Sequence, residues 1–186
     1  MTVRCSRVAA VVALAGLLPF AAPAGPVVAA PQPTAAVCLF ESPVEITPAL
    51  VMAEAVEGTF RGVSAPLHCA GTYEGTLLAG TGSGRFTGAF RSGRPGGALP
   101  AGRCLFVSGT AAISGTLDAA DGRVILLEAT LTWVSVGPLA VGGGTAGSAL
   151  VEAAGEFRPD PGHPGETCFV SPLSHAVLTG QAVLTG

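Results

Sequence analysis

Two stretches of strictly alternating apolar and polar residues lie between residues 103 and 136. In the first, residues 103–117, one parity carries Leu105, Val107, Ala111, Ile113 and Leu117, and the other carries serine and threonine. In the second, residues 123–136, the apolar parity carries Ile125, Leu127, Ala129, Leu131 and Trp133. Because successive side chains of a strand point to opposite faces, this pattern predicts two half-buried antiparallel strands. The intervening Asp121-Gly122 is typical of a hairpin turn.

Weaker alternation predicts further strands at residues 67–77, 85–91, 145–157 and 176–186, with turns at residues 81–84 and 142–144. Glycine recurs inside these strands, which favours a strongly curved sheet. Its positions there are Gly71, Gly75, Gly88, Gly109, Gly115, Gly147 and Gly155. The sequence therefore predicts an all-β fold. We expect an antiparallel meander of about seven to nine strands, forming a small barrel or sandwich with at most one short helix.

Residues 47–57 fit two local structures. Thr47, Pro48 and Gly58 stand where a helix would have its N-cap, its first residue and its terminating glycine. The same residues also alternate loosely, as in a strand. The local sequence leaves helix and strand equally open.

The first 29 residues have the features of a secretory signal peptide. Arg4 and Arg7 precede an apolar run from Val8 to Leu18, and small residues then offer cleavage after Ala24 or Ala29. The run is too short for a transmembrane helix, so we expect a secreted protein without a membrane span after cleavage. The predicted organisation is a signal peptide (residues 1–29), an extended N-terminal arm (30–43) and one all-β domain (44–186).

Four cysteines remain after cleavage: Cys38, Cys69, Cys104 and Cys168. In an exported domain this number predicts two disulfides, for which three pairings exist. Cys69 and Cys104 open predicted strands on either side of the strand that carries Phe86 and Phe90. We therefore predict a Cys69–Cys104 bond, with Cys38–Cys168 tying the N-terminal arm to the last loop.

Charge is sparse, at 11% of residues, and lysine and asparagine are absent. Loss of Arg4 and Arg7 takes the formal net charge from −3 to −5, which disfavours nucleic acid as a partner. Four arginines nevertheless surround one glycine- and proline-rich loop: Arg85, Arg91, Arg94 and Arg103. They are candidates for binding an anionic polymer, although a solvated rim is the favoured interpretation.

Short Gly-Thr strands link this chain to a group of exported proteins. The segments concerned are Cys69-Ala70-Gly71-Thr72, Ser108-Gly109-Thr110-Ala111-Ala112-Ile113, Asp121-Gly122-Arg123 and the late Cys168. From Val44 onward the chain resembles small secreted all-β proteins of GC-rich actinobacteria. The resemblance implies an exported β-meander with one or two disulfides and transfers no functional residue.

Residues with catalytic chemistry are scarce. The three histidines, His68, His163 and His175, have no nucleophile elbow beside them, so we predict no catalytic centre. Residues 142–147 match a dinucleotide-binding pattern but lack its strand-to-helix context, so we expect a hairpin turn and no cofactor. Glu152 and Glu156 share one strand parity, as on a solvent-facing surface, and Trp133 is assigned to the core rather than to a sugar-binding surface.

One loop contains residues with metal-ligand chemistry. Asp160, His163 and Glu166 recur at three-residue spacing in a segment rich in proline and glycine. Their oxygen and nitrogen donors make them candidates for one cation. A stiff, solvated connection is the more common structure for such a segment and is favoured.

Two functions remain open, with a secreted hydrolase as a third. The first is a non-catalytic module that recognises cell wall, an extracellular polymer or a protein. The second is a small barrel that encloses an apolar ligand. An exposed apolar patch would favour the first, a lined interior cavity the second, and a cleft joining histidine with acids the third.

Overall fold

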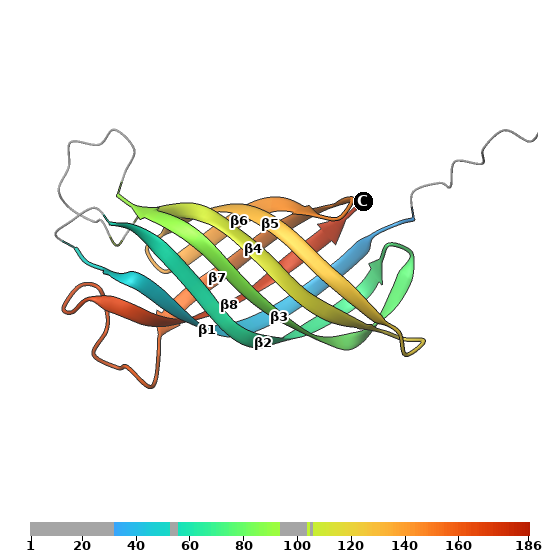
Figure 1. Ribbon diagram of the computed structural model, residues 1–186, viewed down its shortest axis with the longest axis horizontal. Coiled ribbons are helices and arrows are strands. Elements are labelled where there is room, and N and C mark those ends of the chain that lie inside the picture. The colour runs from blue at the N-terminus through green and yellow to red at the C-terminus, as the bar shows by residue number, and fades with distance from the viewer. Residues whose placement is uncertain (1–31, 53–55, 94–103, 105) are drawn as a thin grey trace, which may run out of the picture. The chain divides into compact units, whose positions relative to one another are not determined.

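The computed structural model describes residues 32–52, 56–93, 104 and 106–186. Eight antiparallel strands, each paired with the next along the chain, form a closed barrel because β8 pairs with β1 (Figure 1). They are β1 (Ala35–Leu50), β2 (Glu57–Tyr73), β3 (Thr76–Ser92), β4 (Phe106–Ala119), β5 (Val124–Val136), β6 (Leu139–Ala146), β7 (Ala149–Pro159) and β8 (Leu173–Thr185). The predicted all-β fold is confirmed, and the described residues contain no helix.

The alternation in the sequence corresponds to the inner and outer faces of the barrel. On β5, Leu127, Ala129 and Leu131 are buried, whereas Glu128, Thr130 and Thr132 between them are exposed. On β4 the predicted apolar parity also faces inward, and Leu117 is completely buried. The predicted hairpin is confirmed, because β4 and β5 pair continuously from Phe106↔Val136 to Asp118↔Val124.

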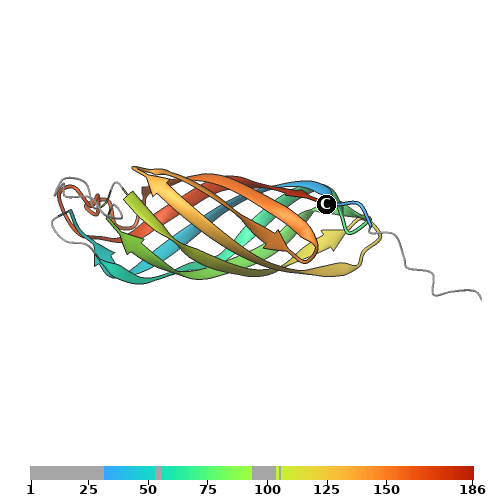
Figure 2. The ribbon, with the colours of Figure 1, turned by 90° about the horizontal axis from the view of Figure 1, so that it is seen from above.

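The two ends of the barrel differ in their connections. At one end the strands are joined by three short turns, at residues 74–75, 120–123 and 147–148. At the other end lie the longer connections at residues 51–56, 93–105 and 160–172, beside the short turn at residues 137–138. Figure 2 shows the strands running between these two ends. We call them the short-turn end and the long-loop end.

Two predicted turns were wrong because glycine can serve close packing as well as turns. Residues 81–84 lie inside β3, and residues 142–144 lie inside β6. A Cβ atom on Gly82 would overlap the carbonyl oxygen of Thr116, and one on Gly144 would overlap that of Thr130. The actual turns are at Glu74-Gly75, with φ angles of 46° and 74°, and at Gly147, with φ of 57°.

The described domain begins earlier than predicted. β1 starts at Ala35, so residues 35–43 pair with β8 as part of the barrel and are not a separate arm. Residues 47–50 belong to β1, so this part of the ambiguous segment is a strand and not a helix. Residues 53–55 lie outside the described residues. The predicted signal peptide also lies outside them. Within the described part, no helix is long and apolar enough to cross a membrane.

Both disulfides differ from the predicted pairing, which was wrong. Cys38 bonds to Cys69, its direct partner in the β1–β2 ladder, with Cα atoms 4.0 Å apart. Cys104 bonds to Cys168 in the β7–β8 connection. The predicted Cys69–Cys104 bond would have to join opposite ends, because Cys69 lies near the short-turn end of β2 and Cys104 precedes β4 at the long-loop end.

This connectivity predicts a large stability loss on removal of one bond. Cys38 and Cys69 are 31 residues apart, so replacing both with alanine should lower the free energy of unfolding by about 4 kcal/mol in the chain-entropy model. Urea unfolding of the double variant against the wild type measures this. Peptide mapping without reductant should recover Cys38–Cys69 and Cys104–Cys168, and recovery of Cys69–Cys104 would contradict the assignment.

Candidate functional site

The centre of the barrel contains an apolar cavity of about 140 Å³. Leu127, Leu131, Leu184 and Val151 contribute aliphatic surface to it. Alanines also line it, among them Ala111, Ala129, Ala153 and Ala182. Eight strands give an interior just wide enough for side chains to fill or for one small ligand to occupy. The cavity exists because alanines stand at positions where larger side chains would fill the interior.

An aromatic layer crosses the barrel along one side of this cavity. Phe60 on β2 contacts Trp133 on β5 edge to face, with ring centroids 5.5 Å apart. Phe86 extends the layer from Phe60 at 5.9 Å, and Phe157 extends it from Trp133 at 6.1 Å. All four rings line the cavity. The prediction that Trp133 is part of the interior is confirmed.

Glycines on neighbouring strands make room for two of these rings. Phe60 is paired with Gly88 across β2 and β3, and Phe86 is paired with Gly62 across the same two strands. A Cβ atom on either glycine would overlap the ring of its partner. The two Phe–Gly pairs thus hold both rings against the barrel wall, each directly over a glycine.

Trp133, which lines the cavity, carries an unpaired hydrogen-bond donor. Its indole Nε1 is buried and has no partner among the described residues. Ser42, a polar residue that also lines the cavity, donates its hydroxyl hydrogen bond to the carbonyl oxygen of Val63 at 2.9 Å. A buried N–H without an acceptor costs roughly 1–3 kcal/mol. The cavity is therefore apolar, and one residue of its lining, Trp133, carries a buried donor without a partner.

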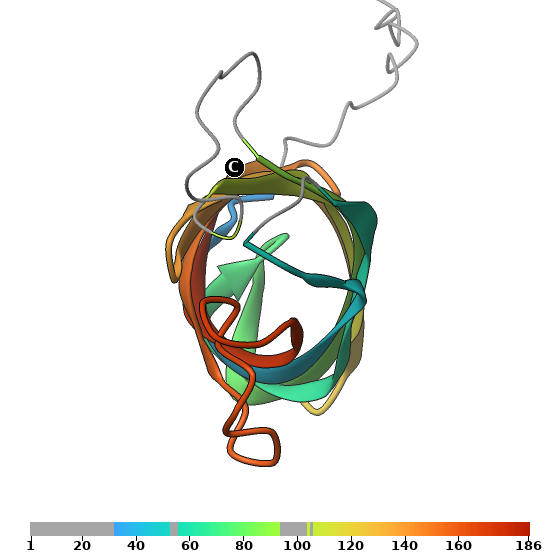
Figure 3. The same ribbon diagram turned by 90° about the vertical axis from the view of Figure 1, so that its left-hand side faces the viewer.

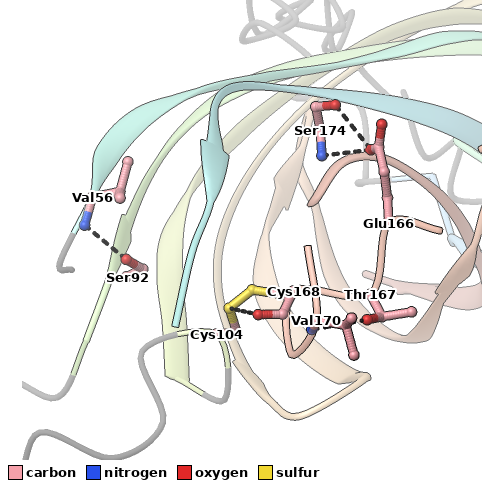
Figure 4. The surroundings of a disulfide bond; sticks show 8 residues. All are labelled: Val56, Ser92, Cys104, Glu166, Thr167, Cys168, Val170 and Ser174. Atoms are coloured by element: carbon pink, nitrogen blue, oxygen red, sulfur yellow. Dashed lines mark hydrogen bonds between the residues drawn. A yellow bond between two sulfur atoms is a disulfide. The ribbon is translucent and has the colours of Figure 1, made fainter. Parts of the chain in front are cut away.

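The β7–β8 connection covers the long-loop end. Cys168 is buried there against Val44, Ile46, Leu50 and other inward-facing side chains. Figure 3 shows part of the connection lying across the opening of the barrel. The Cys104–Cys168 bond fastens it to the segment before β4, and nearby Glu166 points toward Ser174 (Figure 4).

A second cluster of chemical interest lies in the same connection. His163, Glu166 and His175 each place one potential ligand atom within 4.8 Å of the others. The imidazole rings of His163 and His175 stack in parallel, with centroids 3.7 Å apart. Asp160 bonds to His163 through Oδ2 and Nδ1, 3.0 Å apart, so it holds that ring rather than joining the three-residue group. Of the predicted metal candidates, the structure brings His163 and Glu166 together with His175.

The other predicted site residues are dispersed. Arg85 and Arg91 lie on the outer face of β3, where Arg91 pairs with Glu57 at 2.7 Å. Arg94 and Arg103 lie outside the described residues, so their grouping with Arg85 and Arg91 stays a prediction. Glu152 and Glu156 lie on the outer side of β7, and Glu156 pairs with Arg158.

An exposed apolar patch covers the outer face of β5 and β6 at the long-loop end. Val134 pairs with Val141, and Val136 pairs with Leu139. All four side chains are exposed. This is the feature expected of a surface-recognition module.

Phe60 and Phe157 were not predicted as cavity residues, and His175 was not predicted as a partner of Glu166. An available signal for Phe60 was its position between the inward-facing Gly58 and Gly62 in the strand before Phe86. His175 gave no local signal, because it is nine residues from Glu166 along the chain.

Comparison with known proteins gives no guide to this site. No protein-family model matches the chain, and no curated protein or solved structure matches it either. The function must therefore be argued from the geometry.

Glu166 predicts a specific acid sensitivity. Partial burial acts to raise its pKa, but hydrogen bonds from the Ser174 N–H and hydroxyl and from His175 outweigh burial and lower the pKa of Glu166 to about 2. A carboxylate with a depressed pKa stabilises the fold above its ordinary pKa and loses that contribution as pH falls. The stability difference between wild type and Glu166→Gln should therefore be full at pH 6 and shrink from about pH 4.5 toward pH 2.

Urea unfolding at several pH values measures this difference. Glu152→Gln, which removes an exposed carboxylate on the outer face of β7, is the matched control. A wild-type-to-Glu166→Gln difference that stays constant from pH 6 to pH 2 would contradict the role assigned to Glu166.

Proposed function

We propose that this barrel binds a small apolar molecule in its central cavity. The observation that supports this is the cavity itself: about 140 Å³ of space with an almost wholly apolar lining. Apolar cavities of roughly 150 Å³ stay free of water and take up benzene-sized molecules. A ligand of that size, or a longer one that displaces a lining side chain, matches the space.

The energetic cost of the empty cavity supports the same conclusion. At about 24 cal/mol per Å³, a cavity of this volume corresponds to roughly 3 kcal/mol of lost packing. Exchange of Ala111, Ala129 or Ala153 for a larger residue would recover part of this energy. A ligand recovers it instead through its own contacts, so the presence of these alanines in the lining supports a binding site.

The donor on Trp133 narrows the ligand class. The buried, unpaired N–H belongs to a residue of the lining, so the proposed ligand carries one acceptor oxygen on a hydrocarbon body, such as a ketone, ester or lactone, which reaches this N–H when the indole ring shifts. A pure hydrocarbon would fill the space and leave the N–H unpaired. A strongly polar or charged ligand would lose its hydration without replacement.

Disulfide bonding indicates an oxidising compartment outside the cytoplasm. Secretion through the predicted signal peptide is part of the proposal, and the resemblance to small secreted actinobacterial proteins supports it. Recognition of cell wall, an extracellular polymer or a protein remains the alternative, supported by the exposed β5–β6 patch. The interior cavity favours ligand binding, because the barrel alone forms a space of defined shape for a ligand.

Filling the cavity should abolish binding. Ala111→Leu places an isobutyl group inside, whereas Ala112→Leu places the same group on the exposed face of the same strand. Titration of the purified protein with ethylbenzene, followed by NMR, should show saturable binding in the wild type and in Ala112→Leu. Binding to Ala111→Leu should be at least tenfold weaker, with a thermal midpoint equal to or above that of wild type because a void is filled. Absence of saturable binding by the wild type to both ethylbenzene and acetophenone would reject the proposal and favour the surface alternative.

Removal of the indole donor should change ligand preference. Acetophenone and ethylbenzene have similar shape, but only acetophenone carries an acceptor oxygen. We expect wild type to prefer acetophenone and Trp133→Phe to lose about five- to tenfold of that preference, the value of one net hydrogen bond. The ratio of the two dissociation constants is the readout, because it cancels any change in cavity size. An unchanged ratio would exclude the indole as the selecting group.

A further inference from the structure

The group formed by His163, Glu166 and His175 has the composition of a transition-metal site. Two imidazoles and one carboxylate are a common ligand set for zinc and its neighbours in the first transition row. The three ligand atoms lie within 4.8 Å of one another. In tetrahedral geometry two atoms bound to one zinc ion lie roughly 3.4 Å apart, so the widest spacing in this set must close by up to about 1.4 Å.

Hydrogen bonds already position two of the three side chains. Glu166 accepts hydrogen bonds through Oε2 from the Ser174 N–H, the Ser174 hydroxyl and the His175 N–H, each at 2.8 Å. Its Oε1 has only the longer, 3.3 Å contact with His175 Nδ1 and remains available. Asp160 holds Nδ1 of His163, which leaves Nε2 of that ring for an ion. A carboxylate on the second nitrogen is the usual support of a metal-binding histidine.

The surrounding charges favour a cation. Asp160 bonds to His163, and Glu45 on β1 is the ladder partner of His175. Arg61 is the nearby cation, and it is paired with Glu45 at 2.7 Å. Three carboxylates and one arginine thus surround the two imidazoles.

The supporting frame is fixed at both ends. His175 lies on β8 within the barrel ladder, and the Cys104–Cys168 bond anchors the connection two residues beyond Glu166. His163 is the exposed member, so its ring is the one with room to turn. An ion requires this turn, because two rings stacked in parallel cannot both direct a nitrogen lone pair at one point between them.

We propose that His163, Glu166 and His175 bind a divalent transition-metal ion of the zinc class, with water in the remaining position. Binding replaces the stacked imidazole pair with two coordinated rings and ties the β7–β8 connection to β8. This site lies apart from the apolar cavity, so the metal proposal does not depend on the proposed apolar ligand.

Calorimetric titration of the full chain, without an affinity tag, with Zn²⁺ at pH 7.5 tests the proposal. We expect one ion per chain and a thermal midpoint that rises with Zn²⁺ concentration. His163→Ala and His175→Ala should each weaken binding at least tenfold, and His68→Ala should leave it unchanged. His68 is the remaining histidine of the chain and is exposed on the outer face of β2, which makes it the matched control. Binding should also weaken at pH 5, where protons compete for imidazole nitrogen.

Two other outcomes would contradict the proposed metal site. Equal weakening by His68→Ala would show adventitious surface binding only, and unchanged binding in His163→Ala and His175→Ala would place the ion elsewhere. His163→Ala is expected to fold, because His163 is an exposed loop residue outside the core. Its circular dichroism spectrum should match that of wild type. No apolar ligand is present in these titrations, so their result is separate from the test of the cavity.

Discussion

Pairing of the last strand with the first is the constraint on which the rest of this structure depends. β1 and β8 come from opposite ends of the described chain, and their ladder runs from Ala35↔Thr185 to Leu50↔Leu173. This pairing removes both edges of an eight-stranded sheet and makes one face an enclosed interior. Without it, the alternation of apolar and polar residues would give a curved sheet with an open apolar face. With it, the same alternation gives a core, and a cavity becomes possible.

Inside the closed barrel, glycine and aromatic residues act as pairs. Phe60 lies over Gly88 and Phe86 over Gly62, so the large rings fit where the neighbouring strand has no side chain. These rings, together with Trp133 and Phe157, form a layer across the interior. The cavity then follows from the alanines on the other side of the layer. The high glycine content, which looks like a signal for turns, is therefore largely a packing feature.

The fold was predictable from the sequence to the extent that it depends on local alternation. Alternation on both sides of the Asp121-Gly122 turn predicts the β4–β5 hairpin and the inward position of Trp133. Turns were harder, because Gly82 and Gly144 inside strands look the same in sequence as glycines in turns. The turn at Glu74-Gly75 was hidden because glutamate seldom adopts a positive φ.

The sites depend on register, which a single sequence does not define. Cys38 and Cys69 become partners only through the β1–β2 ladder, and Phe60 meets Trp133 only across the closed interior. His175 reaches Glu166 because the β7–β8 connection folds back on the start of β8. The chemical character of these side chains is evident from the sequence. Their contacts depend on strand pairing and are not.

The difference between the two ends of the barrel bears on how such a protein can diversify. Short turns at one end, such as Glu74-Gly75, keep neighbouring strands in register whatever happens at the other end. The longer connections at the opposite end are less restricted outside the Cys104–Cys168 bond, since doubling the length of a flexible loop costs only about 0.6 kcal/mol. Insertions in these connections that leave the disulfide and the buried Cys168 in place should thus be tolerated while the wall of the cavity stays the same. A single barrel of this kind is a scaffold on which the entrance can be changed separately from the interior.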